Sequence, residues 1–452
     1  MTTPQALGAA RPLRPARPAR QVRMPARGRP LPHALPPWAL PGRPLATLWW
    51  LHPLIAVAAI ALVYASFAQF DFSRVVPQSW IPGPHYAWGG ALLLVLALGI
   101  VGTCGDRRAL ALPPPPWTFD LPRWATGALL ATTVFAYLLW FQVLIAQPGL
   151  LVQVLTGQLF NLREIAPTTP GVTTMTQFGV AYVIACIALS ASRVRPLAWW
   201  ERLGVVVVFV LATIRMLAWG ERLALIELLV PGAVAWLAFA RVRRPWLWTL
   251  AVLLPLAAPP LLYGIFTGTE YFRSWTTYQR DYDSIWSFAF ERLLSYYATA
   301  TNNGVGLLVE NTQWPQYSGR YVAEWLYMMP GVGDSLRESV GDVRDQYVDF
   351  VTRYARPEFN NPSGLFPIVF DIGYAGSAVY FLVVGALIGR LWLLWRRRTP
   401  AGVLFHPVMM LYLVELLRFD YLASTRFFPV ALALLFLWSV ARRPHPPAGV
   451  PW

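Results

Sequence analysis

Long runs of apolar residues alternate with short polar connections along almost the whole chain. Each run is close to the length that a helix needs to cross about 30 Å of hydrocarbon. The runs cover residues 46–66, 86–104, 125–146, 172–191, 203–219, 223–240, 247–266, 364–391, 402–418 and 424–441. This pattern predicts an all-α fold, a polytopic transmembrane helix bundle of about ten spans.

One connection is much longer than the others. Residues 267–362 exceed the usual loop length, and their apolar residues recur at helical spacing, as at Phe290, Leu294 and Tyr297. We expect a large helical loop on the outer face of the membrane, where a substrate would be held.

The order of the segments predicts the domain organisation. It comprises a disordered basic tail at 1–44, a first bundle of about seven spans at 45–266, the large loop at 267–362, the last three spans at 363–441 and a short tail at 442–452. Within the first bundle, we expect residues 148–170 to form a loop with one interfacial helix. A very tight hairpin around Gly220 joins two spans.

Composition excludes a soluble domain. The chain is 56% hydrophobic and only 13% charged, whereas soluble proteins carry about 25% charged residues. The net charge of +15 comes from arginines that cluster in the N-terminal tail and in alternate connections. The positive-inside rule then places both termini in the cytoplasm.

Because topology explains the basic charge, we expect the lipid bilayer as a partner and no nucleic acid. The two cysteines, Cys104 and Cys186, and the five scattered histidines match no disulfide framework or metal-binding spacing. We therefore expect no metal and no cofactor.

Charged residues inside the spans are the first candidates for function, since lipid tolerates them poorly. Arg215 precedes the turn at Gly220 and Glu227 follows it, so both lie roughly 7–10 Å below the outer boundary and could pair. Glu221 and Arg222 occupy the turn itself. This group either locks two helices together or forms an anion site, for which arginine is well suited.

Two further groups lie near the same boundary. Glu415 and Arg418 share a helix face, Asp420 lies at the following turn, and Arg426 opens the last span. Asp371 lies inside the eighth span, where Gly373 and Gly376 would let another helix approach closely. For Asp371, a hydrogen bond to a neighbouring helix is an equal alternative to a functional role.

The long loop offers residues of the kind that bind carbohydrate. Aromatic rings pack on sugar C–H faces, while charged and amide groups bind hydroxyls. The candidates in and beside the loop are Arg292, Tyr296, Asn302, Asn303 and Asn361.

Two stretches resemble the O-antigen polymerases, also called oligosaccharide repeat unit polymerases. Gly220-Glu221-Arg222, with Arg215 before it, resembles their Gly-x-Arg hairpin, and residues 361–376 resemble their span after the large loop. The order of spans and loop also matches over most of residues 46–441. The resemblance implies a metal-independent glycosyltransferase that polymerises undecaprenyl-pyrophosphate-linked oligosaccharide repeat units at the outer face of the cytoplasmic membrane.

The resemblance also implies roles for the candidate residues. Arg215 and Arg222 would hold the donor pyrophosphate, and Glu221 or Asp371, with Asp420 as a third choice, would deprotonate the acceptor hydroxyl. The remaining substrate-binding candidates are Glu227, Arg292, Tyr296, Asn302, Asn303, Asn361, Arg418 and Arg426. A chain-length regulator and a flippase are candidate partners.

Three other functions compete with polymerisation. An O-antigen ligase-type transferase shares the donor, but residues 267–362 contain no His, whereas that family's outer loop usually carries one. A transporter of lipid-linked glycan needs a polar path through the bilayer, yet the inner halves of the spans are apolar. A membrane scaffold without catalytic activity would not explain why charged residues cluster within the spans.

Overall fold

A computed structural model describes part of the chain. The described residues are 42–70, 78–104, 120–156, 162, 165, 171–192, 195–271, 275, 278–329, 331–340, 344–355 and 359–441. They belong to one structural unit and are mostly helical, as predicted. The predicted tails lie outside the described residues except at 42–44.

The helices before residue 271 follow the predicted apolar runs. They are α1 Pro53–Ser66, α2 Pro84–Cys104, α4 Arg123–Trp140, α5 Gln142–Ala146, α6 Gly149–Leu155, α7 Val172–Thr176, α8 Phe178–Ser192, α9 Trp199–Trp219, α10 Leu223–Leu237 and α11 Pro245–Glu270. Short 3-10 turns lie at Leu45–Thr47, Trp49–Leu51 and Phe67–Gln69. Strand β1, Arg43–Pro44, pairs antiparallel with β2, Arg241–Val242, so regular structure begins inside the segment expected to be disordered.

The remaining helices divide into two sets. The long connection contains α13 Ile285–Glu310, α14 Glu324–Tyr327, α15 Val332–Val340 and α16 Arg344–Tyr354. After it come α17 Phe366–Arg396, α18 Pro400–Glu415 and α19 Phe427–Val440. The long connection is therefore helical, while its location on the outer face stays a prediction.

Several helices could cross a membrane. Among the described residues, four are long and apolar enough, namely Pro84–Cys104, Thr174–Ser192, Trp199–Trp219 and Phe366–Arg396. Shorter apolar helices lie at Pro53–Gln69, Leu223–Leu237, Pro245–Ala257, Pro400–Glu415 and Phe427–Val440. Every predicted run contains a helix, but the count of ten spans stays a prediction.

Local chemistry explains several helix ends. Before α18, the Thr399 hydroxyl accepts a hydrogen bond from the Gly402 amide, and Pro400 occupies the first helical position, where its missing N–H is not needed. The Ser284 hydroxyl caps α13 in the same way. Helix α9 ends at Gly220, whose φ of 66° is left-handed, a conformation that glycine adopts readily. The predicted hairpin at Gly220 is therefore present.

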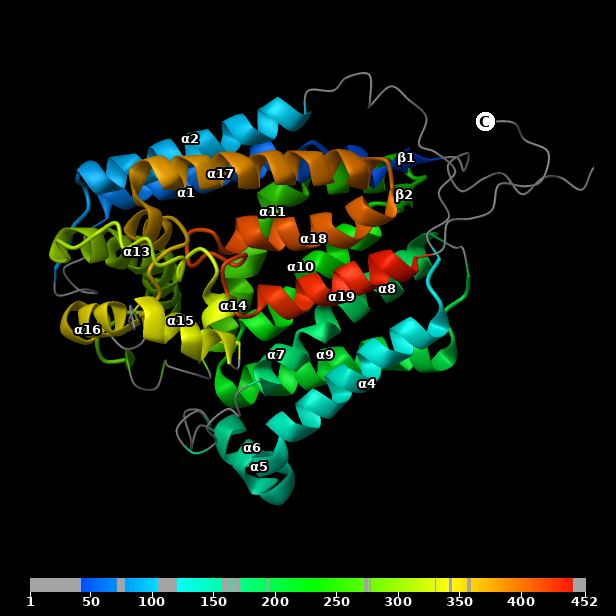
Figure 1. Cartoon of the computed structure of the whole chain (residues 1–452). Helices are drawn as coiled ribbons and strands as arrows, with labels where there is room; N and C mark the ends of the chain where they lie inside the picture. The colour runs from blue at the N-terminus through cyan, green and yellow to red at the C-terminus, as the bar shows by residue number, and fades with distance from the viewer. Residues whose placement is uncertain are drawn as a thin grey trace, which may run out of the picture. The chain divides into compact units, whose positions relative to one another are not determined.

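The longest helix, α17, packs along α2, with α18 and then α19 beside it (Figure 1). A Cβ atom on Gly385 would lie 2.2 Å from the Leu96 carbonyl oxygen, so only glycine permits this approach of α2. Gly373 does not provide the predicted close approach of another helix. With a φ of 71°, it kinks α17, and its neighbour is Pro315 of the long connection rather than another helix.

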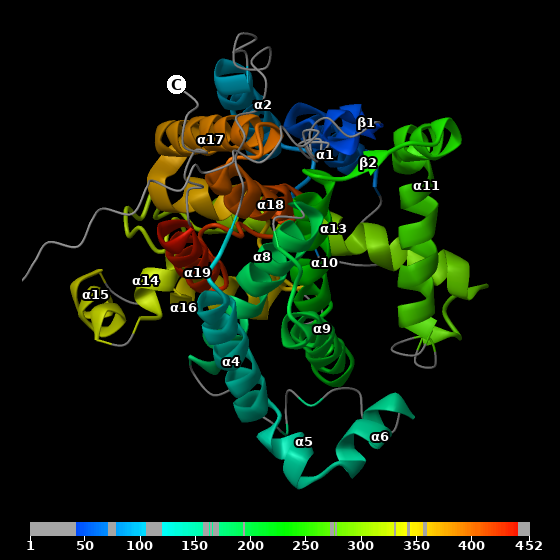
Figure 2. The same ribbon diagram turned by 90° about the vertical axis from the view of Figure 1, so that its right-hand side faces the viewer.

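The helices of the long connection gather at one end of this layered set, at the left in Figure 1. Helix α13 packs against both α11 and α17. In the perpendicular view of Figure 2, α4 leads away from the other helices to the short α5 and α6. Helix α6 lies within the predicted loop at 148–170, while its location at the membrane interface stays a prediction.

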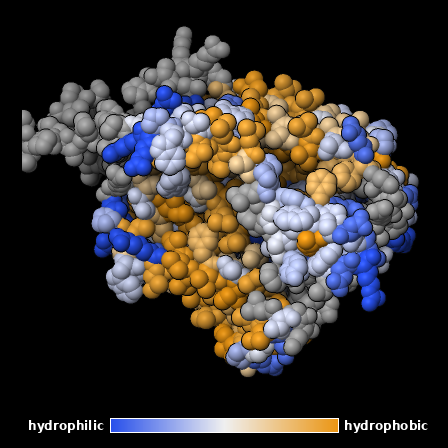
Figure 3. Space-filling model, turned by 180° about the vertical axis from the view of Figure 1, so that it is seen from behind, coloured by the Kyte–Doolittle hydropathy of each residue, from blue (hydrophilic) through white to orange (hydrophobic). Residues whose placement is uncertain are grey.

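Apolar side chains are exposed on several helices, among them Leu98 of α2, Val206 of α9 and Leu256 of α11. Figure 3 shows such side chains across the middle of one face, with hydrophilic residues on either side. Exposed apolar surface of this extent is costly in water and favourable in lipid. It agrees with helices that span a membrane.

Candidate active site

The end of α9 carries a buried arginine that binds the turn after it. Arg215 is 1% exposed. Its Nε and Nη2 donate to Glu221 Oε2 at 2.9 and 2.5 Å, and its Nη1 donates to Thr176 Oγ1 at 2.9 Å. The guanidinium also lies 3.9 Å from the centre of the Trp140 ring, a favourable cation–π contact. Arg215 therefore fixes Glu221 within the protein.

The partner of Glu227 differs from the prediction. Glu227 Oε2 accepts from Arg426 Nη1 at 3.1 Å and from Gln177 Nε2 at 3.2 Å, whereas Arg215 binds Glu221. Arg426 Nη2 also donates to Glu221 Oε2 at 3.1 Å. The sequence analysis paired Arg215 with Glu227 because their predicted depths in the membrane are similar. The side chains point in other directions, and Arg426, which directly precedes α19, lies between Glu221 and Glu227. We call Arg215, Glu221, Glu227 and Arg426 the hairpin network.

A second buried network contains Glu270, which the sequence analysis missed. Glu270, at the end of α11, is 1% exposed. It accepts a hydrogen bond from Arg222 and forms an ion pair with Arg292, whose Nε lies 2.9 Å from Glu270 Oε2. The Arg222 guanidinium lies over the Phe266 ring and that of Arg292 over Phe359. The sequence does show a carboxylate, Glu270, just after an apolar run. No local pattern, however, links Glu270 to Arg222, which lies 48 positions earlier. We call Arg222, Glu270 and Arg292 the Glu270 network.

A third pair lies at the end of α18. Arg418 Nη1 donates to Glu415 Oε2 at 3.0 Å, as their spacing predicted. The Arg418 guanidinium also lies 5.1 Å from the centre of the Tyr296 ring. Arg418 therefore joins α13 to the loop between α18 and α19.

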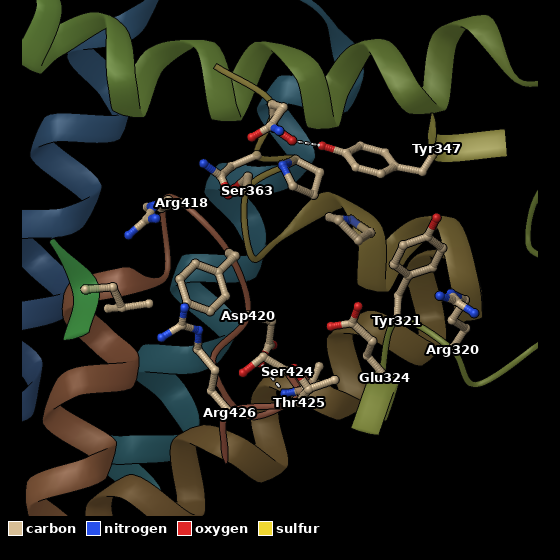
Figure 4. Close-up of a pocket in the computed structure, with 17 residues that line it drawn as sticks. Arg320, Tyr321, Glu324, Tyr347, Ser363, Arg418, Asp420, Ser424, Thr425 and Arg426 are labelled. Atoms are coloured by element: carbon tan, nitrogen blue, oxygen red, sulfur yellow. Dashed lines mark hydrogen bonds between the residues drawn. The ribbon is translucent and has the colours of Figure 1, made fainter. Parts of the chain in front are cut away.

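A cavity of about 370 Å³ opens beside this loop, and we call it the Asp420 cavity. Its wall comes from residues 418–426, from 360–363 before α17, from 320–324 of the long connection and from Tyr347 of α16. Figure 4 shows Arg418, Asp420 and Arg426 on one side and Arg320, Tyr321 and Glu324 on the other. Four predicted residues line it, namely Asn361, Arg418, Asp420 and Arg426.

Asp420 is held rigidly in the cavity wall. Its Oδ2 accepts from the Tyr380 hydroxyl at 2.9 Å and its Oδ1 from the Ala423 amide at 3.0 Å. Asp420 is only 8% exposed, and this burial raises the pKa of its carboxyl to about 6. A carboxyl with a pKa of about 6 can take up and release a proton near neutral pH, as a general base must.

Asp371 has a different environment. It is fully buried and does not line the Asp420 cavity. Its Oδ1 accepts from the Ser318 amide at 2.8 Å, the Ser318 hydroxyl at 3.0 Å and the Gly319 amide at 2.9 Å. Its Oδ2 accepts from the Tyr321 amide at 2.9 Å. Asp371 thus anchors residues 318–321 to α17 and so positions one wall of the cavity.

The two asparagines of α13 also bind backbone. Asn302 accepts from the Trp80 amide at 2.8 Å and donates to the Gln78 carbonyl at 3.0 Å. Asn303 donates to the carbonyls of Phe359 and Asn361 at 2.7 and 3.2 Å. Asn303 therefore supports the cavity segment at 360–363, whereas Asn302 fixes the connection before α2.

The structure adds cavity residues that the sequence analysis did not name. Arg320, Tyr321, Glu324, Asn360 and Tyr347 also line the cavity. Arg320, Tyr321 and Glu324 belong to no motif in the sequence, so no pattern marked them. Only the fold brings them to Asp420.

No family model, curated protein or solved structure matches this chain. Among the described residues, no three His, Cys, Asp or Glu side chains gather in a way that could hold a metal ion. The function must therefore be argued from the chemistry of the site.

Proposed function

We propose that this protein is a membrane glycosyltransferase that polymerises undecaprenyl-pyrophosphate-linked oligosaccharide repeat units, at the outer face of the cytoplasmic membrane. The observation that carries the proposal is that Arg418, Arg426 and the buried Asp420 line one cavity. The cavity combines cations for a pyrophosphate with a carboxylate for proton transfer. The resemblance of the Gly220 hairpin to O-antigen polymerases supports the same reaction.

The buried charges favour an anionic substrate. Three arginines and two carboxylates line the Asp420 cavity, namely Arg320, Arg418 and Arg426 with Glu324 and Asp420. A pyrophosphate that entered beside Arg418 and Arg426 would therefore meet one excess positive charge. Arginine donates two parallel hydrogen bonds to phosphate oxygens, which makes it an effective ligand.

In the proposed reaction, a hydroxyl oxygen of the acceptor attacks the anomeric carbon of the donor glycan. The bond from that carbon to the phosphate oxygen breaks, and undecaprenyl pyrophosphate leaves with both bonding electrons. The Asp420 carboxylate takes the hydroxyl proton. Arg418 and Arg426 stabilise the negative charge that develops on the leaving pyrophosphate.

Position favours Asp420 over the other two candidate bases, since Asp420 lines the cavity and neither Glu221 nor Asp371 does. Glu221 binds two arginines, and both oxygens of Asp371 bind the segment 318–321. In our proposal Glu221 holds Arg426 in place, and Asp371 holds the opposite wall.

The test uses the purified protein and one lipid-pyrophosphate-linked repeat unit from the source cell as sole substrate. We expect the wild type to form a ladder of longer lipid-linked glycans, and Asp420→Asn to reduce its rate by about 100-fold or more. Asp334→Asn, a change at an exposed carboxylate of α15, is the matched control. A ladder formed by Asp420→Asn at the wild-type rate would contradict the assignment. Transfer to a different acceptor would favour a ligase instead.

A further inference from the structure

A second chamber of about 370 Å³ adjoins the Asp420 cavity. It lies between residues 320–324 and one face of α16, and we call it the α16 chamber. Val348, Val351 and Thr352 belong to this chamber alone, while Arg320, Tyr321, Glu324, Tyr347 and Asn360 line both spaces. The two spaces therefore lie side by side, and a long molecule that extends from the Asp420 cavity past the shared side chains would enter the α16 chamber.

The shared residues have the chemistry that a saccharide needs. Tyr321 and Tyr347 supply aromatic rings for sugar C–H faces. Arg320 can donate to sugar hydroxyls and Glu324 can accept from them, while Asn360 can do both. In Figure 4 the Glu324 carboxylate points into the open space between Tyr321 and Asp420.

These side chains are held before any ligand binds. The Tyr347 hydroxyl donates to the Asn360 carbonyl, and the Tyr321 ring packs edge-on against Phe370, with 5.9 Å between ring centres. The Arg320 guanidinium lies 5.3 Å from the centre of the Tyr327 ring. Because Asp371 also anchors the Tyr321 amide, binding would require little ordering of this wall.

We propose that the α16 chamber binds an oligosaccharide segment that extends from the reacting sugar in the Asp420 cavity. This inference rests on the proposed function, since it assumes that a glycan reacts at Asp420. The segment belongs either to the growing chain or to the incoming repeat unit, and both present the same sugar chemistry.

The test measures binding of soluble oligosaccharides, without lipid or pyrophosphate, to the full-length protein in detergent. Fragments of one and of several repeat units are prepared from the surface polysaccharide of the source cell, and calorimetry gives each dissociation constant. We expect Tyr347→Ala and Glu324→Gln each to weaken binding by about tenfold or more, while Tyr347→Phe, which keeps the ring, retains most of it. Arg353→Gln, a change at an exposed position of α16, should bind like the wild type.

Thr352→Trp tests the α16 chamber without changing any residue that also lines the Asp420 cavity. Thr352 lies on the chamber side of α16 and does not line the Asp420 cavity, so a tryptophan there fills the chamber alone. We expect it to lose oligosaccharide binding while its thermal unfolding stays close to that of the wild type. If the longer fragments bind more tightly than a single repeat unit, the chamber holds the growing chain. If all fragments bind with equal affinity, the chamber holds the incoming repeat unit.

The outcomes separate this inference from the proposed function. Binding that Thr352→Trp and Glu324→Gln leave unchanged, or no binding to the wild type, would overturn the chamber assignment even if the polymerisation ladder forms. Binding that these variants abolish, in a protein that forms no ladder, would support the chamber and contradict the proposed polymerisation.

Discussion

Replacing Asp371 by asparagine distinguishes an anchor from a catalytic base. The Asp371 carboxylate accepts hydrogen bonds from the Ser318, Gly319 and Tyr321 amides and from the Ser318 hydroxyl. In Asp371→Asn, one carboxylate oxygen becomes an amide NH₂, which cannot accept. If the remaining oxygen keeps the three donors at Oδ1, the partly buried Tyr321 amide is left facing another donor.

The expected cost follows from these bonds. A hydrogen bond to a charged group contributes about 1.5–3 kcal/mol, and an unsatisfied buried donor costs about 1–3 kcal/mol. We therefore expect Asp371→Asn to lower the free energy of unfolding by about 2–4 kcal/mol. Residues 318–321 should become easier to cleave, and activity should fall because Arg320 and Tyr321 lose their positions.

The assay combines thermal unfolding in detergent, limited proteolysis and the rate of ladder formation, with Asp334→Asn as control. An anchor predicts a lower unfolding temperature together with faster cleavage between α13 and α14. A variant that unfolds and is cleaved like the wild type but makes no ladder would refute our reasoning, because a base can be lost without loss of stability.

Four further predictions concern the cavity. Arg426→Ala leaves the buried Glu227 without its arginine partner, so it should destabilise the protein by about 3–5 kcal/mol, and adding Glu227→Gln should restore part of the unfolding temperature. Because the pKa of Asp420 is about 6 and a base must be ionised, the rate should rise with pH through about 6, and a flat profile would contradict this role. The raised pKa also means that ionisation destabilises the fold, so Asp420→Asn should gain stability over the wild type as pH rises through 6, measured by thermal unfolding. Gly364→Ala would place a Cβ atom 2.7 Å from the Leu416 carbonyl oxygen, so it should displace the cavity wall and reduce activity, measured as ladder formation.

The sequence predicted the helices well because each long apolar run has about the length that a membrane-spanning helix needs. It also predicted the turn at Gly220, since a short polar break between two apolar runs requires a tight reversal. Spacing within one helix was equally informative, as the Glu415–Arg418 pair shows. These are local properties, which the sequence encodes over a few residues.

The partners of the buried charges could not be predicted in the same way. Rise per residue gives the depth of Arg215 and Glu227 but not the direction of each side chain around its helix. Arg426, which binds both Glu221 and Glu227, comes 205 positions after Glu221. Asp371 likewise binds an irregular segment whose path depends on the whole fold. The cavity residues from Arg320 to Glu324 were missed for the same reason.

The most direct test of the central claim counts products in one reaction. The wild-type protein in liposomes receives lipid-pyrophosphate-linked repeat units, and free undecaprenyl pyrophosphate and new glycosidic bonds are measured together. Our account predicts one undecaprenyl pyrophosphate released for each bond formed, with both quantities falling together in Asp420→Asn. Movement of the lipid-linked glycan across the bilayer with no bond formed and no pyrophosphate released would contradict it.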